Sequence, residues 1–172
     1  MSTTPTRRAL LIGAALLPTL ACTAKADTVI PGGADQRRFA NSPWRQLTPD
    51  QWRARLSPEA FHILREEGTE RTFTSPLLDE HRRGTFVCEG CGLELFRSEW
   101  KFNSGTGWPS FYRSIETNLA TQPADGPSFF GAYSEVHCAQ CLGHQGHVFT
   151  DGPLPTGLRY CIDGVALRFV PA

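Results

Sequence analysis

Apolar residues near the start of the folded body recur at helical spacing, behind two recognisable helix starts. Residues 48–51 form a capping box with proline at the first helical position, and Trp52 and Leu56 then fall four residues apart on one face. Residues 57–59 repeat the start signal, and Gly68 is placed to end the segment that follows. The apolar stripe of that segment consists of Ala60, Phe61 and Leu64. The pattern therefore predicts two short helices in succession.

Beyond Arg71 the pattern changes to brief runs rich in aromatic and β-branched residues, separated by Gly, Pro, Asn and Asp. Such runs are typical of short strands joined by turns. We expect strands at residues 85–88, 128–138, 147–149, 159–162 and 166–170. The sequence shows no repeat period and no low-complexity tract. It therefore predicts a mainly β fold, a small antiparallel β domain that follows short N-terminal helices and carries long functional loops.

Residues 1–26 have the organisation of an export signal. Arg7 and Arg8 precede an apolar run at 9–17, and the small-x-small pattern at 24–26 predicts cleavage after residue 26. Adjacent arginines before such a run resemble a twin-arginine signal, the route that exports folded proteins, so we expect a periplasmic protein. An ordinary secretory signal, with the two arginines as its positive charge, is the alternative.

Two further features of this leader bear on the membrane. A second alternative is a lipoprotein signal in which Cys22 is the lipid attachment site. However, Thr19 stands where a lipobox usually has leucine. The apolar run is far shorter than the roughly 20 residues that a spanning helix needs, so we expect no stable membrane association. Residues 27–45 carry Pro, Gly and polar residues without periodicity and predict a flexible lead-in, which leaves residues 46–172 as the domain.

Size and charge narrow the class of protein. A chain of 172 residues and 19.0 kDa fits one domain with a short appendage, and 11 Phe, 4 Trp and 3 Tyr supply material for a core. The formal net charge is zero, so nothing indicates the electrostatic attraction that nucleic-acid binding requires. We expect a monomer with no nucleic-acid partner.

Four of the six cysteines form two identical Cys-x-x-Cys pairs, Cys88 with Cys91 and Cys138 with Cys141. Each pair can direct two thiolates at one ion from a tight turn, and two such turns complete the tetrahedron that Zn²⁺ prefers. We predict one structural zinc ion that clamps two distant hairpins together. Two alternatives stay open: a pair of disulfides, as an oxidising compartment favours, and a compact site of Cys138, Cys141, His144 and His147 that leaves the first pair as a redox couple.

Cys161 is the remaining cysteine once Cys22 departs with the leader. It lies in a predicted strand whose alternation places Arg159, Cys161 and Asp163 on one face. A cysteine that shares its face with polar groups is a candidate reactive thiol, although an inert buried thiol fits the spacing equally well.

Three ordered motifs resemble the peptide methionine-R-sulfoxide reductases, the MsrB family. They are the segments at residues 104–111 (SGTGWPSF), 144–149 (HQGHVF) and 157–162 (GLRYCI), with the Cys-x-x-Cys pairs interleaved. The resemblance covers about residues 46–170. It implies a β-tent of two antiparallel sheets, a structural zinc opposite the active site, and a cysteine nucleophile, here Cys161. It also implies that the substrate is the R epimer of methionine sulfoxide, bound in peptides or free, and that the role is repair of oxidised proteins.

The residue types suit this chemistry. Reduction of a sulfoxide needs a thiolate to attack sulfur while the departing oxygen receives protons. His144 and His147 can bind or protonate that oxygen, and Trp108 offers a flat wall to the substrate methyl group. Arg159 either lowers the pKa of the thiol or pairs with a nearby acid. The remaining candidate residues are Phe149 and Phe111 for substrate binding and Asp163 beside the nucleophile.

The chain departs from the family pattern at several positions. Asp163 stands where the family usually has Asn, and a carboxylate on the face of the thiolate would oppose its formation unless it is protonated, paired with Arg159 or turned away. Gln145, His137 and the Leu142–Gly143 pair also differ from common family residues. Thr106 occupies the glycine-loop position where many relatives have a second, resolving cysteine. We therefore expect an external thiol, such as a thioredoxin-like protein, to reduce the sulfenic acid formed on Cys161.

Two other classes of function compete with the reductase. One is a zinc-clamped binding module that keeps such a fold without catalysis, and Asp163 is the feature that most favours it. The other is a disulfide oxidoreductase that uses Cys88 and Cys91, which leaves Trp108 and Cys161 without a role.

Overall fold

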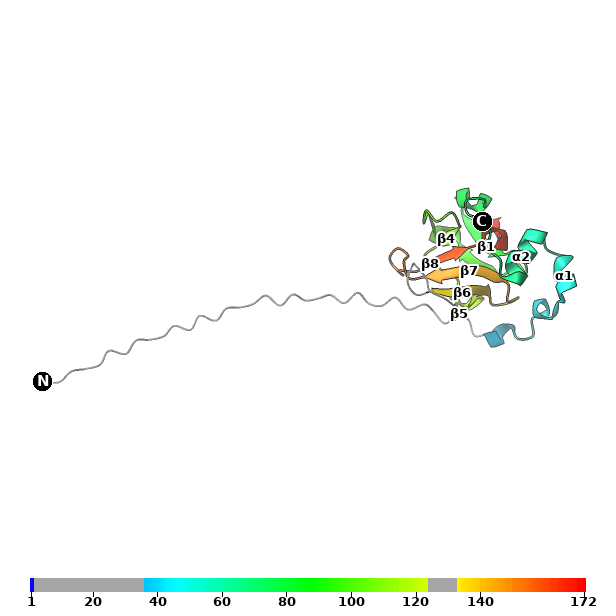
Figure 1. The fold of residues 1–172 in the computed structure, drawn as a ribbon, viewed down its shortest axis with the longest axis horizontal. Helices are drawn as coiled ribbons and strands as arrows, with labels where there is room; N and C mark the ends of the chain where they lie inside the picture. The colour runs from blue at the N-terminus through cyan, green and yellow to red at the C-terminus, as the bar shows by residue number, and fades with distance from the viewer. Residues whose placement is uncertain (2–35, 124–132) are drawn as a thin grey trace.

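The structure, a computed structural model, describes residues 1, 36–123 and 133–172 (Figure 1). Its strands form two antiparallel sheets. The six-stranded sheet runs in the order β3 (Lys101–Phe102), β4 (Ser110–Phe111), β8 (Arg159–Ile162), β7 (His144–Phe149), β6 (Tyr133–Cys138) and β5 (Leu119–Pro123). The three-stranded sheet has the order β2 (Glu94–Arg97), β1 (Gly84–Cys88) and β9 (Leu167–Pro171). The mainly β prediction is confirmed.

The two predicted helices form where their start signals lie. Helix α1 (Pro49–Arg53) has a complete capping box, in which Thr48 and Gln51 each accept from the other's backbone N–H. Helix α2 (Pro58–Glu66) has Ser57 as its N-cap, and the Ser57 hydroxyl accepts from Ala60 N–H. It ends on Glu67, which takes the left-handed conformation (φ 55°), so the stop is one residue earlier than Gly68. The Gly68 N–H then donates to the His62 carbonyl at 3.0 Å, which satisfies one carbonyl near the helix end.

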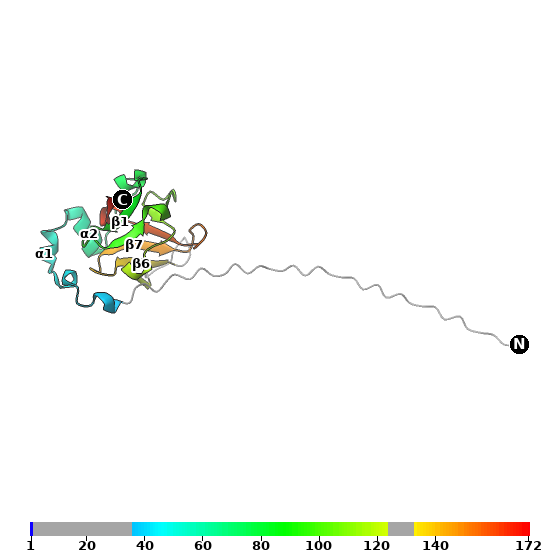
Figure 2. The same cartoon turned by 180° about the vertical axis from the view of Figure 1, so that it is seen from behind.

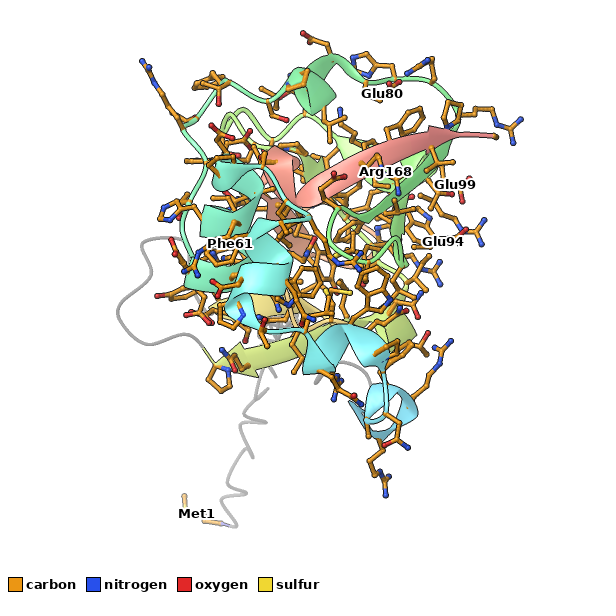
Figure 3. All side chains as sticks on the ribbon, turned by 90° about the vertical axis from the view of Figure 1, so that its right-hand side faces the viewer. Met1, Phe61, Glu80, Glu94, Glu99 and Arg168 are labelled. Atoms are coloured by element: carbon orange, nitrogen blue, oxygen red, sulfur yellow. The ribbon has the colours of Figure 1, made fainter. Side chains whose placement is uncertain are left out.

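The helices lie together at one end of the body, and the view from behind shows the same arrangement (Figures 1 and 2). In Figure 3 the labelled Phe61 marks α2 beside β9, which carries Arg168. Short 3-10 helices fill the connections. They are η1 (Gln36–Phe39), η2 (Pro43–Gln46), η3 (Pro76–Asp79), η4 (Ser98–Trp100), η5 (Glu116–Asn118) and η6 (Gly164–Ala166).

The five predicted strands correspond to β1, β6, β7, β8 and β9. The bounds of β8 are as predicted, and those of the other four differ at one or both ends. Residues 128–132 of one predicted strand lie outside the described residues. Strands β2, β3, β4 and β5 were missed, because two of them have only two residues and the others alternate weakly. Such strands are defined by their partners rather than by a local apolar pattern.

Part of the predicted lead-in lies among the described residues and contacts the domain. Residues 36–45 form two 3-10 segments against the domain, whereas 1–26 and 27–35 lie outside the described residues except for Met1. Arg38 donates to Asn118 at 3.2 Å, and Arg45 donates to the Ala139 carbonyl at 2.7 Å. Trp44 stacks on Trp52 with 5.9 Å between ring centroids. Contacts of this kind, between residues far apart in the sequence, have no local sequence signature.

The core lies between the two sheets. Phe111 stacks on Phe96 at 4.3 Å and meets the edge of Phe86 at 5.0 Å, while Tyr160 contacts Phe96 at 5.7 Å. These rings are almost fully buried. The inner face of the six-stranded sheet is therefore apolar, and its opposite face is free to carry chemistry. Among the described residues, no helix combines the length and apolar character of a membrane span.

Candidate active site and metal centre

An irregularity in β7 places two histidines three residues apart on one face. In a regular strand such residues point to opposite faces. The pairing of β6 with β7 shifts register, so that Val136 lies opposite Gly146 and His137 opposite His144, with Gln145 as an extra residue. The His144 and His147 rings consequently meet edge to face with centroids 5.5 Å apart.

Gly146 is required at this bulge. Its φ of +134° is a conformation that L side chains rarely adopt, and a Cβ there would lie 2.2 Å from the Cys161 carbonyl oxygen. The bulge also turns Gln145 toward the opposite side, where its amide reaches Cys88 Sγ at 3.5 Å. One backbone feature thus serves both the histidine pair and the cysteine cluster.

Strand register gathers the polar groups on the outer face of the six-stranded sheet. Cys161 pairs with His147 on one side and with Ser110 on the other, and His147 pairs in turn with Glu135. Directly opposed side chains on one face of a sheet are close neighbours. Cys161 is therefore flanked by a hydroxyl and an imidazole, which supports a reactive rather than an inert thiol.

A pocket of about 230 Å³ opens at Cys161. It contains four more of the predicted site residues, namely Trp108, His147, Phe149 and Asp163, together with Thr69 and Gly146. A volume of this size is below the usual range of drug-sized pockets and suits one side chain. The predicted residues are thus mostly brought together, and the exceptions are His144, Arg159 and Phe111.

Glu70 holds this pocket together and was not predicted as a site residue. Its carbonyl accepts from the Trp108 indole N–H at 2.9 Å, and its N–H donates to Asp163 Oδ1 at 2.7 Å. Its own carboxylate accepts from Gly164 N–H at 2.6 Å. Because these bonds join Glu70 to distant parts of the chain, no local sequence pattern marks it as a site residue. It fixes the indole wall and the acid next to the nucleophile.

Opposing influences act on the Cys161 thiol. Burial raises its pKa above the ordinary value, and the Asp163 charge acts in the same direction. The Thr106 hydroxyl, the Arg159 charge and the Ser110 hydroxyl lower the pKa, but the balance remains upward. Thr106 Oγ1 lies 3.7 Å from the sulfur. The thiol at rest therefore keeps its proton near neutral pH.

The relation between Asp163 and Arg159 settles an alternative that the sequence left open. Arg159 is a bidentate partner of Asp151, with two bonds of 2.8 Å, and also lies over the Phe149 ring. Asp163 instead accepts from Glu70, and burial raises its pKa to about 7. The acid beside the nucleophile is therefore protonated in part near neutral pH, rather than paired with Arg159.

Both histidines favour the neutral form. Burial, followed by the charges of His137 and His147, lowers the pKa of His144 to about 4, and burial also lowers that of His147. A neutral imidazole still donates one N–H. His147 can therefore donate a hydrogen bond to an oxygen in the pocket without carrying a charge. His147 reaches the pocket directly, whereas His144 lies behind it, 2% exposed.

Phe111 does not reach the pocket, which corrects its assignment to substrate binding. Its neighbour Ser110 shares a face with Cys161, so strand alternation turns Phe111 into the core between the sheets, where it is 0% exposed. Phe149 does line the pocket and stacks on Tyr133 with 5.6 Å between centroids.

The two Cys-x-x-Cys turns converge on one point. All four sulfurs lie within 4.8 Å of one another, and the closest pairs are Cys91 to Cys138 at 3.5 Å and Cys88 to Cys141 at 3.7 Å. Thiolates around a tetrahedral zinc, each at about 2.3 Å, would lie about 3.8 Å apart. The backbone N–H of Gly143 and the Gln145 amide donate to these sulfurs, as expected for thiolate ligands.

The cluster can thus hold a metal ion such as zinc. The five described cysteines are free thiols, which favours a metal site over the two disulfides. His144 groups with Glu135 and His137 rather than with the cysteines, so the compact Cys–His alternative is not formed.

The site first defines a class, a thiol enzyme that admits a small electrophilic group to Cys161. A family model described as the SelR domain matches residues 56–171. The chain belongs to this family, the methionine sulfoxide reductases of the MsrB type. It is therefore an enzyme that reduces methionine sulfoxide, which implies oxidised proteins as substrates and leaves the binding-module alternative without support.

Several relatives carry the description peptide methionine sulfoxide reductase MsrB. The one from Pseudomonas putida is 52% identical over 124 residues, which cover 72% of this chain and 92% of that protein. The one from Thiobacillus denitrificans is 50% identical over 124 residues and covers 72% and 93%. The one from Methanosarcina barkeri is 48% identical over 124 residues and covers 72% and 87%.

Among solved structures, a Mis18 "Yippee-like" domain overlaps 53% of this chain and 98% of its own, with 17% identity and a TM-score of 0.44.

Proposed function

We propose that this enzyme reduces the R epimer of methionine sulfoxide in oxidised proteins, through a sulfenic acid on Cys161 that an external thiol reduces. The observation that carries the proposal is the pocket itself, in which Cys161 lies with Trp108 and His147. The choice of the R epimer rests on the family resemblance.

In the first step, Cys161 Sγ attacks the sulfoxide sulfur while the oxygen accepts a hydrogen bond from His147, which lines the pocket. The oxygen then passes from the methionine sulfur to Cys161, which gives the thioether and a cysteine sulfenic acid. Two electrons move from the thiol to the sulfoxide, and the thiol proton ends on the transferred oxygen. Because burial keeps that proton on the resting thiol, the substrate oxygen is its natural acceptor.

Trp108 positions the substrate in this step. Its ring is fixed by the indole bond to Glu70, so it offers a rigid apolar wall to the methyl group. In this proposal the sulfoxide reaches Cys161 through the pocket, and His147 lies on the strand directly beside Cys161.

In the second step, the sulfenic acid must be reduced. A dithiol forms a mixed disulfide with Cys161 and releases water, and its second thiol then frees the enzyme thiol as the dithiol becomes a disulfide. Thr106 is the near neighbour of the sulfur and cannot form a disulfide. The other described cysteines belong to the metal cluster. A thioredoxin-like donor is the class of reductant that fits.

The metal in the proposal is one zinc ion, held by Cys88, Cys91, Cys138 and Cys141. When bound, it supplies a four-coordinate clamp between the β1–β2 turn and the β6–β7 turn, and no reaction step uses it. We also propose that residues 1–26 direct export to the periplasm by the twin-arginine route, that lipid anchoring through Cys22 does not occur, and that the mature enzyme is a monomer. The mature N-terminus, read by Edman degradation or mass spectrometry, tests the export proposal.

Turnover of separated R and S epimers, with dithiothreitol as reductant, tests the reaction. We expect the wild type to consume the R epimer alone, and Cys161→Ser to consume neither while it retains its metal content and melting temperature. Consumption of the S epimer, or full activity of Cys161→Ser, would refute the proposal.

A further inference from the structure

A second cluster of metal-ligating groups lies on β6 and β7, apart from the four cysteines. It consists of Glu135, His137 and His144, whose ligand atoms all lie within 4.8 Å of one another. Glu135 Oε2 and His137 Nε2 are 3.3 Å apart, and the His137 and His144 rings meet with centroids 5.3 Å apart. The β7 bulge brings His144 onto the face of the other two groups.

The state of His144 is the second observation. The residue is 2% exposed, and neither ring nitrogen has a hydrogen-bond partner among the described residues. An unpaired buried polar group costs about 1–3 kcal/mol, and such groups are rare in native structures. A metal ion between the three groups would satisfy one of these nitrogens.

We propose that Glu135, His137 and His144 bind a divalent transition-metal ion, zinc in the first instance, with water as a further ligand. Two imidazoles and a carboxylate form a donor set typical of zinc and unlike the thiolate cluster. Ligands at about 2.1 Å from zinc lie about 3.4 Å apart, so the Glu135–His137 pair already has this spacing. His144 closes the remaining gap by a small shift.

An ion can reach this site from solvent, and the side chain that now contacts two of the ligands can be displaced. The Glu135 and His137 side chains keep 23% and 12% exposure, which gives an ion a path from solvent. In the structure, the Gln122 amide nitrogen donates to Glu135 at 2.7 Å and lies 3.2 Å from His137. Gln122 is exposed and can rotate away when an ion enters.

Occupancy of the site would act on catalysis. The His144 ring lies 5.5 Å from that of His147, which lines the pocket. An ion would occupy a His144 nitrogen and add positive charge beside His147. Filling the site therefore lowers reductase turnover, a consequence that rests on the proposed function, whereas the binding itself does not.

The binding experiment uses Cys161→Ser protein, so that the reactive thiol cannot bind the added ion. The protein with its cysteine cluster loaded is dialysed at a free zinc concentration fixed by a chelating buffer, and bound zinc is counted by mass spectrometry. We expect two equivalents per chain, and one after a further His137→Gln. His62→Gln is the matched control and should keep both ions, since His62 pairs with Glu66 at 3.1 Å on α2 and the part of the chain that the structure describes offers no third ligand there. One equivalent throughout, or two in the His137→Gln protein, would overturn the site.

Turnover is then measured on chains with Cys161 intact. Without added zinc, His137→Gln and wild type should be equally active, which separates this test from a failure of the proposed function. Added free zinc should inhibit wild type and His62→Gln at least tenfold more than His137→Gln. Equal inhibition of all three, or no inhibition of an enzyme that binds the second ion, would overturn the inhibitory role.

Discussion

Replacement of Asp163 by Asn isolates the charge that opposes the nucleophile. Asn keeps an oxygen that can accept the Glu70 N–H, so the geometry of the pocket should be retained. Asp163 has extended backbone (φ −64°, ψ 119°) directly after β8, so its side chain lies about 6.6 Å from that of Cys161. At that distance two unit charges repel by about 2.5 kcal/mol at an effective dielectric constant of roughly 20, and by about 0.6 kcal/mol in bulk water.

The repulsion exists only while Asp163 is ionised, and its pKa of about 7 sets the pH window. Near pH 8 the carboxylate is charged, and Asp163→Asn should raise the alkylation rate of Cys161 by iodoacetamide about threefold to seventyfold. Near pH 6 the acid is mostly neutral, and the two rates should converge. Reductase turnover should be unchanged or higher in the variant.

The assay follows alkylation of Cys161 by peptide mass spectrometry in metal-loaded protein, with Cys161→Ser as the background. A rate ratio that is the same at both pH values would refute the electrostatic reasoning. A loss of turnover of a hundredfold or more in Asp163→Asn would show that the acid has a dedicated catalytic role.

The remaining predictions concern the loop, the bulge, the cluster and the pH dependence of stability. Thr106→Cys should form a disulfide with Cys161 after one turnover without reductant, seen as a loss of free thiols, because the present hydroxyl lies 3.7 Å from the sulfur. Gly146→Ala should cost roughly 3 kcal/mol in thermal unfolding, whereas Gly105→Ala, which meets no atom within 4 Å, should cost about 1 kcal/mol through its positive φ alone; equal losses would contradict the steric argument. Cys91→Ser should lose the cluster metal and at least 10-fold in the equilibrium constant for folding, and full metal retention would argue against a four-sulfur site. Because burial raises the pKa of Asp163 from 3.8 to about 7, the folded state binds the extra proton between these values, and unfolding free energy falls as pH rises through them. Urea titrations should show that Asp163→Asn removes this fall, on the order of 4 kcal/mol, and an unchanged slope would refute the shift.

The sequence predicted those parts of the fold that have local signals. The capping box at Thr48 and the aromatic runs of β1 and β8 are such signals, and the structure has elements at each. The two-residue strands β3 and β4 have no such signal, because their extended form depends on pairing with β8 and with each other. The same holds for residues 36–45, which are ordered by contacts with distant parts of the chain.

The site divides in the same way. Spacing alone predicted the cysteine cluster, since two Cys-x-x-Cys turns can satisfy one ion wherever the fold brings them together. The sequence marked His144 and His147 as candidate groups for the substrate oxygen, but the bulge at Gln145 that places them on one face follows from strand register. Glu70 escaped notice because its role is carried by backbone groups that any residue possesses. Phe111 was misassigned because a motif groups residues by sequence, while strand alternation separates them by face.

The central claim is that Cys161 alone takes the oxygen from the substrate. Mature enzyme, metal-loaded and free of reductant, is mixed with one equivalent of an R-sulfoxide peptide and then with a sulfenic-acid trap, and each cysteine is read by peptide mass spectrometry. The account predicts one methionine formed per chain and a trapped sulfenic acid at Cys161, with the other cysteines unmodified. Methionine formed while Cys161 remains a free thiol, or an intramolecular disulfide in place of the trapped species, would contradict it.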